Sequence, residues 1–390
     1  MHFISVVLQF LIYEILKTAK KSPSLLGSIH YRIQDQIIDS YNTTPGSLLL
    51  HSLLSRMKDS GTEYVVMEVS SHALKQSRVS GIDFRLAALT NITGDHLDYH
   101  RTMTDYVKSK MLLFKSLNKD GIAVLNSDDK FYNEFKKCIC TKIISYGINK
   151  NADFKATHIE SDINGSRFFM DTPNGTINIR TPLIGRHNIY NILATAAISY
   201  AEKIEFNIMN EAIGRFHCVP GRLESVEAGQ PFKVFIDYAH THDALRNILS
   251  ELRRLGKGKI IVVFGCGGNR DRTKRAKMGR IASNFADYVI LTNDNPRKEN
   301  PDAILDEIKK GFYRTFKNYK KIPDRFKAIE ESLAEREPSD IVVIAGKGHE
   351  EYQIIAGERF PFNDRKAVKR ILASRYSPLH VAGKEKGAAG

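Results

Sequence analysis

The sequence predicts an α/β protein with two domains, each built around a mostly parallel β-sheet. Apolar strand-like runs alternate with helical stretches in both halves of the chain, which is typical of βαβ units. The length of 390 residues suits two or three domains of about 150 residues. Hydrophobic residues make up 42% and charged residues 26%, a composition that excludes collagen-like, coiled-coil and disordered proteins.

The first element is a helix, which the apolar spacing over residues 10–16 predicts. No basic segment precedes the apolar start and no small-residue cleavage site follows it, so it does not read as a signal peptide. Glu14 interrupts the apolar run well before the length of a membrane span. We therefore expect a cytoplasmic protein with no membrane partner.

The rest of the first domain alternates as a parallel sheet requires. The expected strands cover residues 64–69, 86–92 and 121–125. The expected intervening helices cover residues 48–57 and 106–117. Asn164-Gly165 and Asn174-Gly175 are strong hairpin signals, and they predict a small antiparallel insert over residues 151–184. A helix over residues 188–203 follows.

A second alternation begins near Val219-Pro220-Gly221. The expected strands, each ending in a polar or glycine-rich turn, cover residues 234–236, 260–264, 288–292 and 341–345. This pattern predicts a doubly wound domain whose functional loops lie at the carboxyl ends of its strands. We place the domains at residues 1–218 and 219–377 and expect a disordered tail over residues 378–390.

The charge balance favours anionic ligands without selecting one. Lys and Arg number 58 against 44 Asp and Glu, a net charge of +14, which attracts nucleic acid, anionic lipid, nucleotides or carboxylate substrates alike. Four cysteines are too few for a disulfide scaffold and lack metal-site spacing, so they indicate a reduced protein.

Carboxylates and imidazoles follow two expected strands between Met67 and His100. Glu68 closes one strand ahead of Ser70, and Asn91 closes the next ahead of residues 95–100, which include His96. We expect these parallel strands to be adjacent, so that their ends form one crevice that suits a hard cation and phosphate oxygens. The alternative for each residue alone is a helix or strand cap.

Other polar groups of the first domain allow two interpretations each. Residues 42–44 place an amide and two hydroxyls before a Pro-started helix, where a cap explains them equally well. Gln76 lies near Arg78, which could pair a phosphate or carboxylate. Lys110 lies on the same helix face as Tyr106, four residues earlier. Taken by itself, this position predicts an ordinary surface lysine.

A third polar group stands at the start of the 188–203 helix. His187, Asn188 and Asn191 suit recognition of a base edge or a helix cap, and both readings stay open.

In the second domain, charged residues of both signs follow the strands. Arg270 and Arg297 offer cations for a carboxylate, whereas Asp294 and Glu350 offer anions for an ammonium group. This is the set of charges that a zwitterionic amino acid requires. The glycines at 265, 267 and 268 would also let backbone N–H groups approach an anion.

Eight motifs in order carry a family resemblance. They read MEVSSHAL, TNITGDHLDYH, GRHNIYN, VPGRLE, DYAHT, FGCGGNRDRTKR, DNPR and AGKGHE. Together they resemble the Mur ligases of peptidoglycan synthesis, and within that family the ligases that add diaminopimelate. The resemblance runs from about residue 10 to about residue 374 and implies a central ATPase-type domain followed by a Rossmann-like domain that binds the amino acid.

The resemblance implies an ATP-dependent amide ligase that uses Mg²⁺. ATP would phosphorylate the D-glutamate side-chain carboxylate of UDP-MurNAc-L-Ala-D-Glu, and the amine of meso-diaminopimelate would attack the acyl phosphate. Activation replaces a poor electrophile with a good leaving group, while the metal and basic groups offset phosphoryl charge. We expect these small molecules as partners, no nucleic acid, and a monomer.

The resemblance also implies roles for individual residues. The residues matching binders of the muramoyl-dipeptide nucleotide are Asn42, Thr43, Thr44, Ser70, Gln76 and Arg78. The residues matching the metal and catalytic site are Glu68, His96 and Lys110, the last as a carbamylated lysine. Those matching ATP contacts are His187, Asn188, Asn191, Arg222 and Asp237. Those matching the diaminopimelate pocket are Arg270, Asp294, Asn295, Pro296, Arg297, Gly346 and Glu350, with Arg297 favouring diaminopimelate over lysine by pairing its distal carboxylate.

The sequence departs from the family pattern at its start. The family's phosphate-binding loop, of the Gly-Thr-Asn-Gly-Lys-Thr-Thr type, would align with MHFISVVLQ, and no Gly-Lys-Ser or Gly-Lys-Thr occurs in the 390 residues. We therefore expect a chain that lacks the loop and the uridine-binding amino-terminal domain and is impaired in catalysis. His242 stands where the family usually has Pro.

Three alternatives remain. A folylpolyglutamate synthase shares the architecture and acyl-phosphate chemistry, although NTTP and DNPR argue against it. A non-catalytic binding protein derived from the ligase would explain the missing loop. Nucleic-acid binding has only the net charge in its favour, and no motif.

Overall fold

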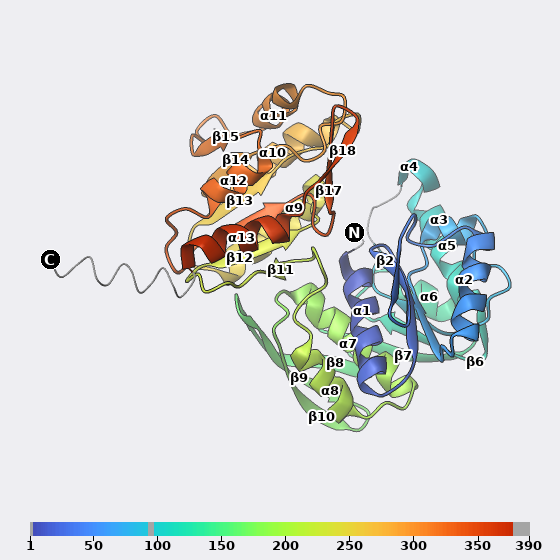
Figure 1. Cartoon of the computed structure of the whole chain (residues 1–390). Coiled ribbons are helices and arrows are strands. Elements are labelled where there is room, and N and C mark those ends of the chain that lie inside the picture. Colours follow the sequence, from blue (N-terminus) through green and yellow to red (C-terminus); the bar gives the residue numbers. More distant parts are fainter. Residues whose placement is uncertain (1–2, 93–96, 377–390) are drawn as a thin grey trace. The chain divides into compact units, whose positions relative to one another are not determined.

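The computed structural model describes residues 3–92 and 97–376 (Figure 1). The chain divides into two compact units, Met1–His217 and Cys218–Gly390, each with its own parallel strands. The predicted α/β class is confirmed. The expected tail over residues 378–390 lies outside the described residues, as does His96. Within those described, no helix is long and apolar enough to cross a membrane.

The first unit contains two sheets. The smaller sheet has the order β3-β2-β1-β4, in which only β1 and β4 pair in parallel; its strands are β1 (Pro23–Leu26), β2 (His30–Ile33), β3 (Gln36–Asp39) and β4 (Tyr64–Met67). The larger has the order β10-β9-β8-β7-β6-β5; its strands are β5 (Phe84–Leu89), β6 (Leu117–Asn126), β7 (Lys142–Gly147), β8 (Phe154–Asp162), β9 (Gly165–Thr172) and β10 (Gly175–Thr181).

The predicted antiparallel hairpins are present, and they extend the larger sheet. β8 pairs in parallel with β7 and antiparallel with β9, so the parallel and antiparallel strands form one continuous sheet. At both turns the predicted glycine begins the returning strand: Gly165 pairs with Asp162, and Gly175 pairs with Thr172. Gly175 has φ +116°, a conformation that favours glycine.

One expectation about the first unit is wrong. We expected the strands before Glu68 and Asn91 to be neighbours, but β4 pairs with β1 and β5 pairs with β6, and each ends its own sheet. The reason is that strand-like composition does not specify which ladder a strand joins. In the described part of the chain, β4 and β5 therefore each present one edge that pairs with no other strand.

Helices cover these sheets and fix the first unit's core. They are α1 (Phe3–Thr18), α2 (Ser47–Asp59), α3 (Ser71–Lys75), α4 (Leu97–His100), α5 (Met103–Lys115), α6 (Tyr132–Cys138), α7 (Arg186–Ala201) and α8 (Phe206–Arg215). The predicted first helix is α1, which packs against α7, α8 and β1. Gln9 on α1 is buried, and its Nε2 donates to Leu26 O at 2.6 Å and Val66 O at 3.0 Å, joining the helix to β1 and β4.

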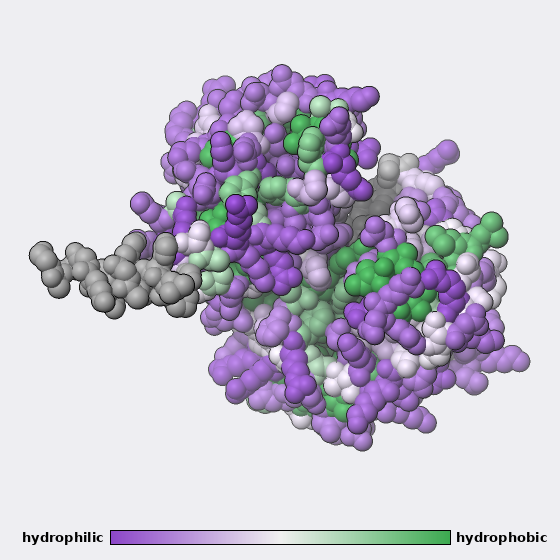
Figure 2. All heavy atoms as spheres, in the orientation of Figure 1, coloured by the Kyte–Doolittle hydropathy of each residue, from purple (hydrophilic) through white to green (hydrophobic). Residues whose placement is uncertain are grey.

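Some apolar surface of the first unit stays exposed. Figure 2 shows a mostly hydrophilic face, with hydrophobic residues gathered over part of this unit near α1 and α2. Leu48, at the start of α2, is 92% exposed, and Val65 in the middle of β4 is 38% exposed.

The second unit is a doubly wound sheet with the order β11-β12-β16-β13-β14-β15. Its strands are β11 (Glu224–Ser225), β12 (Lys233–Asp237), β13 (Ile260–Phe264), β14 (Tyr288–Leu291), β15 (Tyr319–Lys321) and β16 (Ile341–Ala345), and β17 (Tyr352–Ile355) with β18 (Glu358–Pro361) form a separate hairpin. The pairings from β12 through β16, β13 and β14 to β15 are all parallel, so these five strands end at the same edge. Because β16 lies between β12 and β13, the strand order changes there, where such sheets bind ligands.

Helices pack on this sheet in two groups. They are α9 (His242–Leu255), α10 (Thr273–Phe285), α11 (Pro301–Lys309), α12 (Arg325–Ser332) and α13 (Asp364–Tyr376). α10 packs against both α9 and α11, while α12 and α13 share a core with one face of the strands. At the start of α12 and α13, Arg325 and Asp364 form a fully buried two-pronged ion pair, with Nε–Oδ1 and Nη2–Oδ2 distances of 2.7 Å.

We expect Asp364→Ala to destabilise the protein by about 3–5 kcal/mol, because it leaves the Arg325 charge buried without its carboxylate. Urea denaturation would measure the loss. Asp306→Ala is the matched control, since Asp306 pairs with Lys321 in solvent, and it should cost far less. Equal losses in both variants would contradict the buried-charge argument.

Candidate active site

The carboxyl end of β4 gathers several predicted residues of the first unit. Glu68 is buried, and its Oε2 accepts hydrogen bonds from the Ser28 N–H at 2.9 Å and the Ser28 hydroxyl at 2.7 Å. The Ser28 and Thr43 hydroxyl oxygens lie 3.0 Å apart. Thr44 donates to Glu68 O at 2.8 Å and accepts from the Ser70 N–H at 3.0 Å. The Ser28 hydroxyl thus contacts the Glu68 carboxylate directly, while the Thr43 hydroxyl contacts Ser28 and the Thr44 hydroxyl contacts the Glu68 backbone.

Arg78 extends this cluster on its other side. Its Nη1 donates to Thr44 O at 3.0 Å, and its Nε and Nη2 donate to Gln76 Oε1 at 2.8 and 2.6 Å. Asn42 joins through its backbone, because its carbonyl accepts the Tyr31 hydroxyl at 2.6 Å. The Ser70 hydroxyl also caps α3 by accepting the Ala73 N–H at 3.2 Å. Ser70 therefore caps the helix through its side chain and joins the cluster through its backbone N–H.

Lys110 lies on α5 next to Tyr106, whose ring centre is 5.3 Å from that of His100. Its Nζ is 5.4 Å from the centre of the Tyr106 ring, as the shared helix face predicts. Buried His100 places Nε2 2.9 Å from the Ser71 hydroxyl oxygen and stacks edge-on to His72. Across residues 3–92 and 97–376, no group of three or more His, Cys, Asp or Glu side chains could hold a metal ion.

A cavity of about 440 Å³ opens at the ends of β5 and β6 and includes His187. Asp128 organises its wall. This carboxylate accepts the N–H groups of Ile148, Asn149 and Lys150 at 2.7–2.9 Å and the Tyr190 hydroxyl at 2.7 Å. Burial raises the pKa of Asp128, but these donors outweigh it and leave the pKa below its ordinary value.

The other two predicted residues on α7 lie apart from this cavity's lining. Asn188 donates to Ile184 O at 2.8 Å, and Asn191 donates to Asn188 Oδ1 at 3.1 Å. Both are buried, and their contacts serve the start of the helix, while Asn191 Oδ1 has no hydrogen-bond partner among the residues described. Arg186 and Tyr190, which sequence reasoning missed, line the cavity instead.

In the second unit, Asp237 ends β12 with its side chain fully buried. Its two oxygens accept the N–H groups of Leu223 and Ala239, each at 2.7 Å. Burial raises its pKa to about 7, against the opposing effects of Arg222 and the two N–H donors. Arg222 also lies over the Tyr238 ring, 5.0 Å from its centre. Asp237 therefore fixes the turn that carries Arg222.

The ends of β14 and β16 form a compact polar cluster. Asn295 donates to Glu350 Oε2 at 3.0 Å, and its Oδ1 accepts from the Ile354 N–H at 2.9 Å. The Lys347 ammonium, which is fully buried, donates to Glu350 at 2.8 Å and to Asn295 at 3.2 Å and lies 3.7 Å from Asp294. Gly346 has φ +114°, and a Cβ there would lie 3.4 Å from Asp294 Oδ2.

Lys347 was not among the predicted site residues, although it stands inside a motif that carries the resemblance. It supplies one positive charge to two buried or half-buried carboxylates. Burial raises the pKa of Asp294, and Lys347 and Arg325 oppose this effect. A lysine between two glycines at a strand end is the signal that could have identified it.

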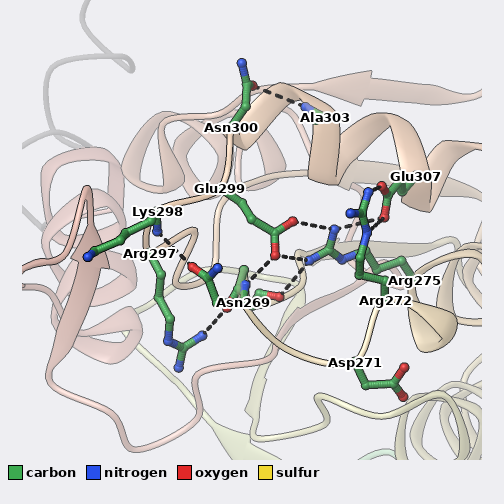
Figure 3. Close-up of polar contacts among 12 residues, drawn as sticks. Asn269, Asp271, Arg272, Arg275, Arg297, Lys298, Glu299, Asn300, Ala303 and Glu307 are labelled. Carbon is green, nitrogen blue, oxygen red and sulfur yellow. Dashed lines mark hydrogen bonds and ion pairs between the residues drawn. The ribbon is translucent and has the colours of Figure 1, made fainter.

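Arg297 lies on the turn after β14, against the loop after β13 (Figure 3). Pro296, just before it, approaches the same loop through its carbonyl. Arg297 has φ +53°, its N–H donates to Ile354 O at 2.9 Å, and its Nη1 donates to Gly268 O at 2.9 Å. A Cβ on Gly268 would lie 1.9 Å from Pro296 O, so only glycine permits this contact. Arg270 is exposed on the same glycine-rich loop.

We expect Asp237→Asn to remove a pH dependence of stability. The folded pKa of about 7 exceeds the ordinary value of 3.8, so between these values the folded state holds a proton that the unfolded state has released. The free energy of unfolding contributed by Asp237 therefore falls as the pH rises through that range. Urea denaturation of both proteins across it should show the wild-type advantage shrinking; a constant difference would contradict the raised pKa.

Comparison with known proteins identifies the family of the chain. The model of the Mur ligase middle domain matches residues 9–199, and that of the Mur ligase glutamate ligase domain matches residues 221–348. UDP-N-acetylmuramoyl-L-alanyl-D-glutamate–2,6-diaminopimelate ligases from Bacillus licheniformis and Bacillus velezensis are 43% and 44% identical, covering 93% and 92% of this chain and 75% and 74% of theirs. A solved structure of a ligase of that name is 32% identical with a TM-score of 0.72, covering 94% of this chain and 76% of its own. The chain belongs to the Mur ligase family.

Proposed function

We propose that this chain carries the active-site residues of an ATP-dependent ligase that joins meso-diaminopimelate to the D-glutamate side chain of UDP-MurNAc-L-Ala-D-Glu in peptidoglycan synthesis. The cluster of Asp294, Asn295 and Glu350 beside Arg297 carries the proposal. It offers anions for an ammonium group and a guanidinium for a carboxylate. The names of the similar ligases support the same substrate.

The reaction has two steps. In the first, the bond from the γ-phosphorus to its bridging oxygen breaks, and a carboxylate oxygen of D-glutamate bonds to that phosphorus. In the second, the amine nitrogen attacks the acyl carbon, the carbon–oxygen bond to phosphate breaks, and the nitrogen loses a proton. The products are an amide, ADP and phosphate.

The first unit supplies groups for the phosphorylation step. Mg²⁺, when bound, neutralises charge on phosphoryl oxygens. The Glu68 carboxylate with the Ser28, Thr43 and Thr44 hydroxyls fits a hard cation, which prefers oxygen ligands. A carbamylated Lys110 would supply a further carboxylate. His187 and the cavity around it would receive the ATP base.

The second unit selects the amino acid. Asp294 and Glu350 would hold its ammonium group, and Asn295 is fixed between Lys347 and Glu350 to face the same ligand. Arg297 would pair the distal carboxylate, which lysine lacks. This pairing accounts for a preference for diaminopimelate.

We expect calorimetry to show binding of diaminopimelate that Arg297→Ala weakens at least about tenfold, because a charge-assisted pair is lost. Arg246→Ala is the control, since Arg246 pairs with Asp243 on the exposed side of α9. Binding of a folate in place of diaminopimelate would favour the folylpolyglutamate synthase alternative. Unchanged affinity in Arg297→Ala would contradict the role of that residue.

We also propose that these 390 residues, assayed alone, ligate poorly. They contain no Gly-Lys-Ser or Gly-Lys-Thr, so the backbone N–H groups and lysine that cradle ATP phosphates are not supplied. With ATP, Mg²⁺ and both substrates, ADP release should stay at background, while the Bacillus licheniformis ligase run in parallel is active. Measurable ligation by this chain would overturn this proposal.

A further inference from the structure

Arg275 is a buried arginine that the proposed function does not use. It lies on α10 with its side chain 1% exposed. Its Nη1 lies 2.9 Å from Glu299 Oε2 and 2.9 Å from Glu307 Oε2, and its Nη2 donates to Glu299 Oε1 at 3.0 Å (Figure 3). Arginine is rarely buried so completely unless it is paired, so this guanidinium is held in one position.

The same guanidinium reaches the loop after β13. Nη2 also donates to Gly267 O at 3.2 Å. Both carboxylate oxygens of Glu299 accept hydrogen bonds from Arg275, and Glu299 also accepts the N–H of Asn269. Asn269 Oδ1 in turn accepts the Lys298 N–H at 3.1 Å. Arg275 therefore binds both the glycine-rich loop and the turn that carries Arg297.

The Arg297 guanidinium lies on the backbone that this network holds. Its Nη1 donates to Gly268 O at 2.9 Å, between the two residues fixed by Arg275 and Glu299. Gly268 N–H in turn donates to Asn295 O at 2.9 Å. A Cβ on Gly267 would lie 2.9 Å from Arg297 Nη1, so the side chain and the loop are in direct contact.

We propose that Arg275 is a positioning residue that, through Glu299 and residues 267–269, sets the guanidinium of Arg297 for the distal carboxylate of the amino-acid substrate. This inference rests on the proposed function for its ligand. The ammonium end has further contacts of its own, because Lys347 donates to the Asn295 side chain and Gln353 donates to Asp294 O. Arg275 thus affects selectivity for the second carboxylate without touching the substrate.

The test combines binding with local protection. Calorimetry with diaminopimelate should show a Kd raised by about tenfold to a hundredfold in Arg275→Met, as expected for a displaced binding group. In an Arg297→Ala background the same change should add nothing, because Arg275 acts through Arg297. Hydrogen exchange should accelerate over residues 265–272 and 294–300.

Controls separate positioning from stability. Arg253→Met removes another arginine clamp of this unit, on Asp287 and Phe285 O, and should leave the Kd and both loops unchanged. Glu299→Gln, which keeps Arg275 paired with Glu307, should reproduce a smaller Kd increase and serves if Arg275→Met does not fold.

The outcomes are distinct. Additive losses in the double variant, or wild-type affinity in Arg275→Met, would overturn the positioning role. Absence of diaminopimelate binding by the wild-type chain would instead overturn the proposed function, while hydrogen exchange would still decide whether Arg275 orders the two loops.

Discussion

The pocket of the second unit depends on the buried pair of Arg325 and Asp364. In addition to the Asp364 carboxylate, the Arg325 guanidinium donates to Ala345 O at 3.1 Å and to Asn293 O at 3.3 Å. These carbonyls stand where β16 ends and where the turn after β14 begins, immediately before the two segments that bear the polar cluster. One ion pair therefore ties the starts of two helices to the starts of both recognition loops.

Two more buried cations of the second unit, Lys347 and Arg275, are also paired with carboxylates. Lys347 faces Asp294 and Glu350, and Arg275 faces Glu299 and Glu307. Both of these buried cations have carboxylate partners within the protein, so the loops that they contact are held without a ligand. Binding groups that are already oriented lose less entropy when the ligand binds, which favours affinity and selectivity.

The sequence predicted the architecture well because strand-ending polar residues are a local signal. Glu68, Asp237 and Asp294 all lie at or just beyond strand ends, as expected. The wrong prediction concerned strand pairing, which depends on contacts between distant parts of the chain. The sequence pattern around β4 and β5 does not specify that they join different sheets. Asn188 shows a chemical limit, because a side-chain amide at a helix start satisfies the cap and suits base recognition equally well.

The separation of β4 and β5 has a consequence for how this protein behaves in concentrated solution. Among the strands of residues 3–92 and 97–376, β4 and β5 each pair along one edge only, and Val65 keeps apolar surface exposed on β4. Such edges are templates for edge-to-edge association, which proteins normally prevent with charges, bulges or a covering segment. These two short strands are therefore places where an extended segment could pair with the chain in concentrated solution.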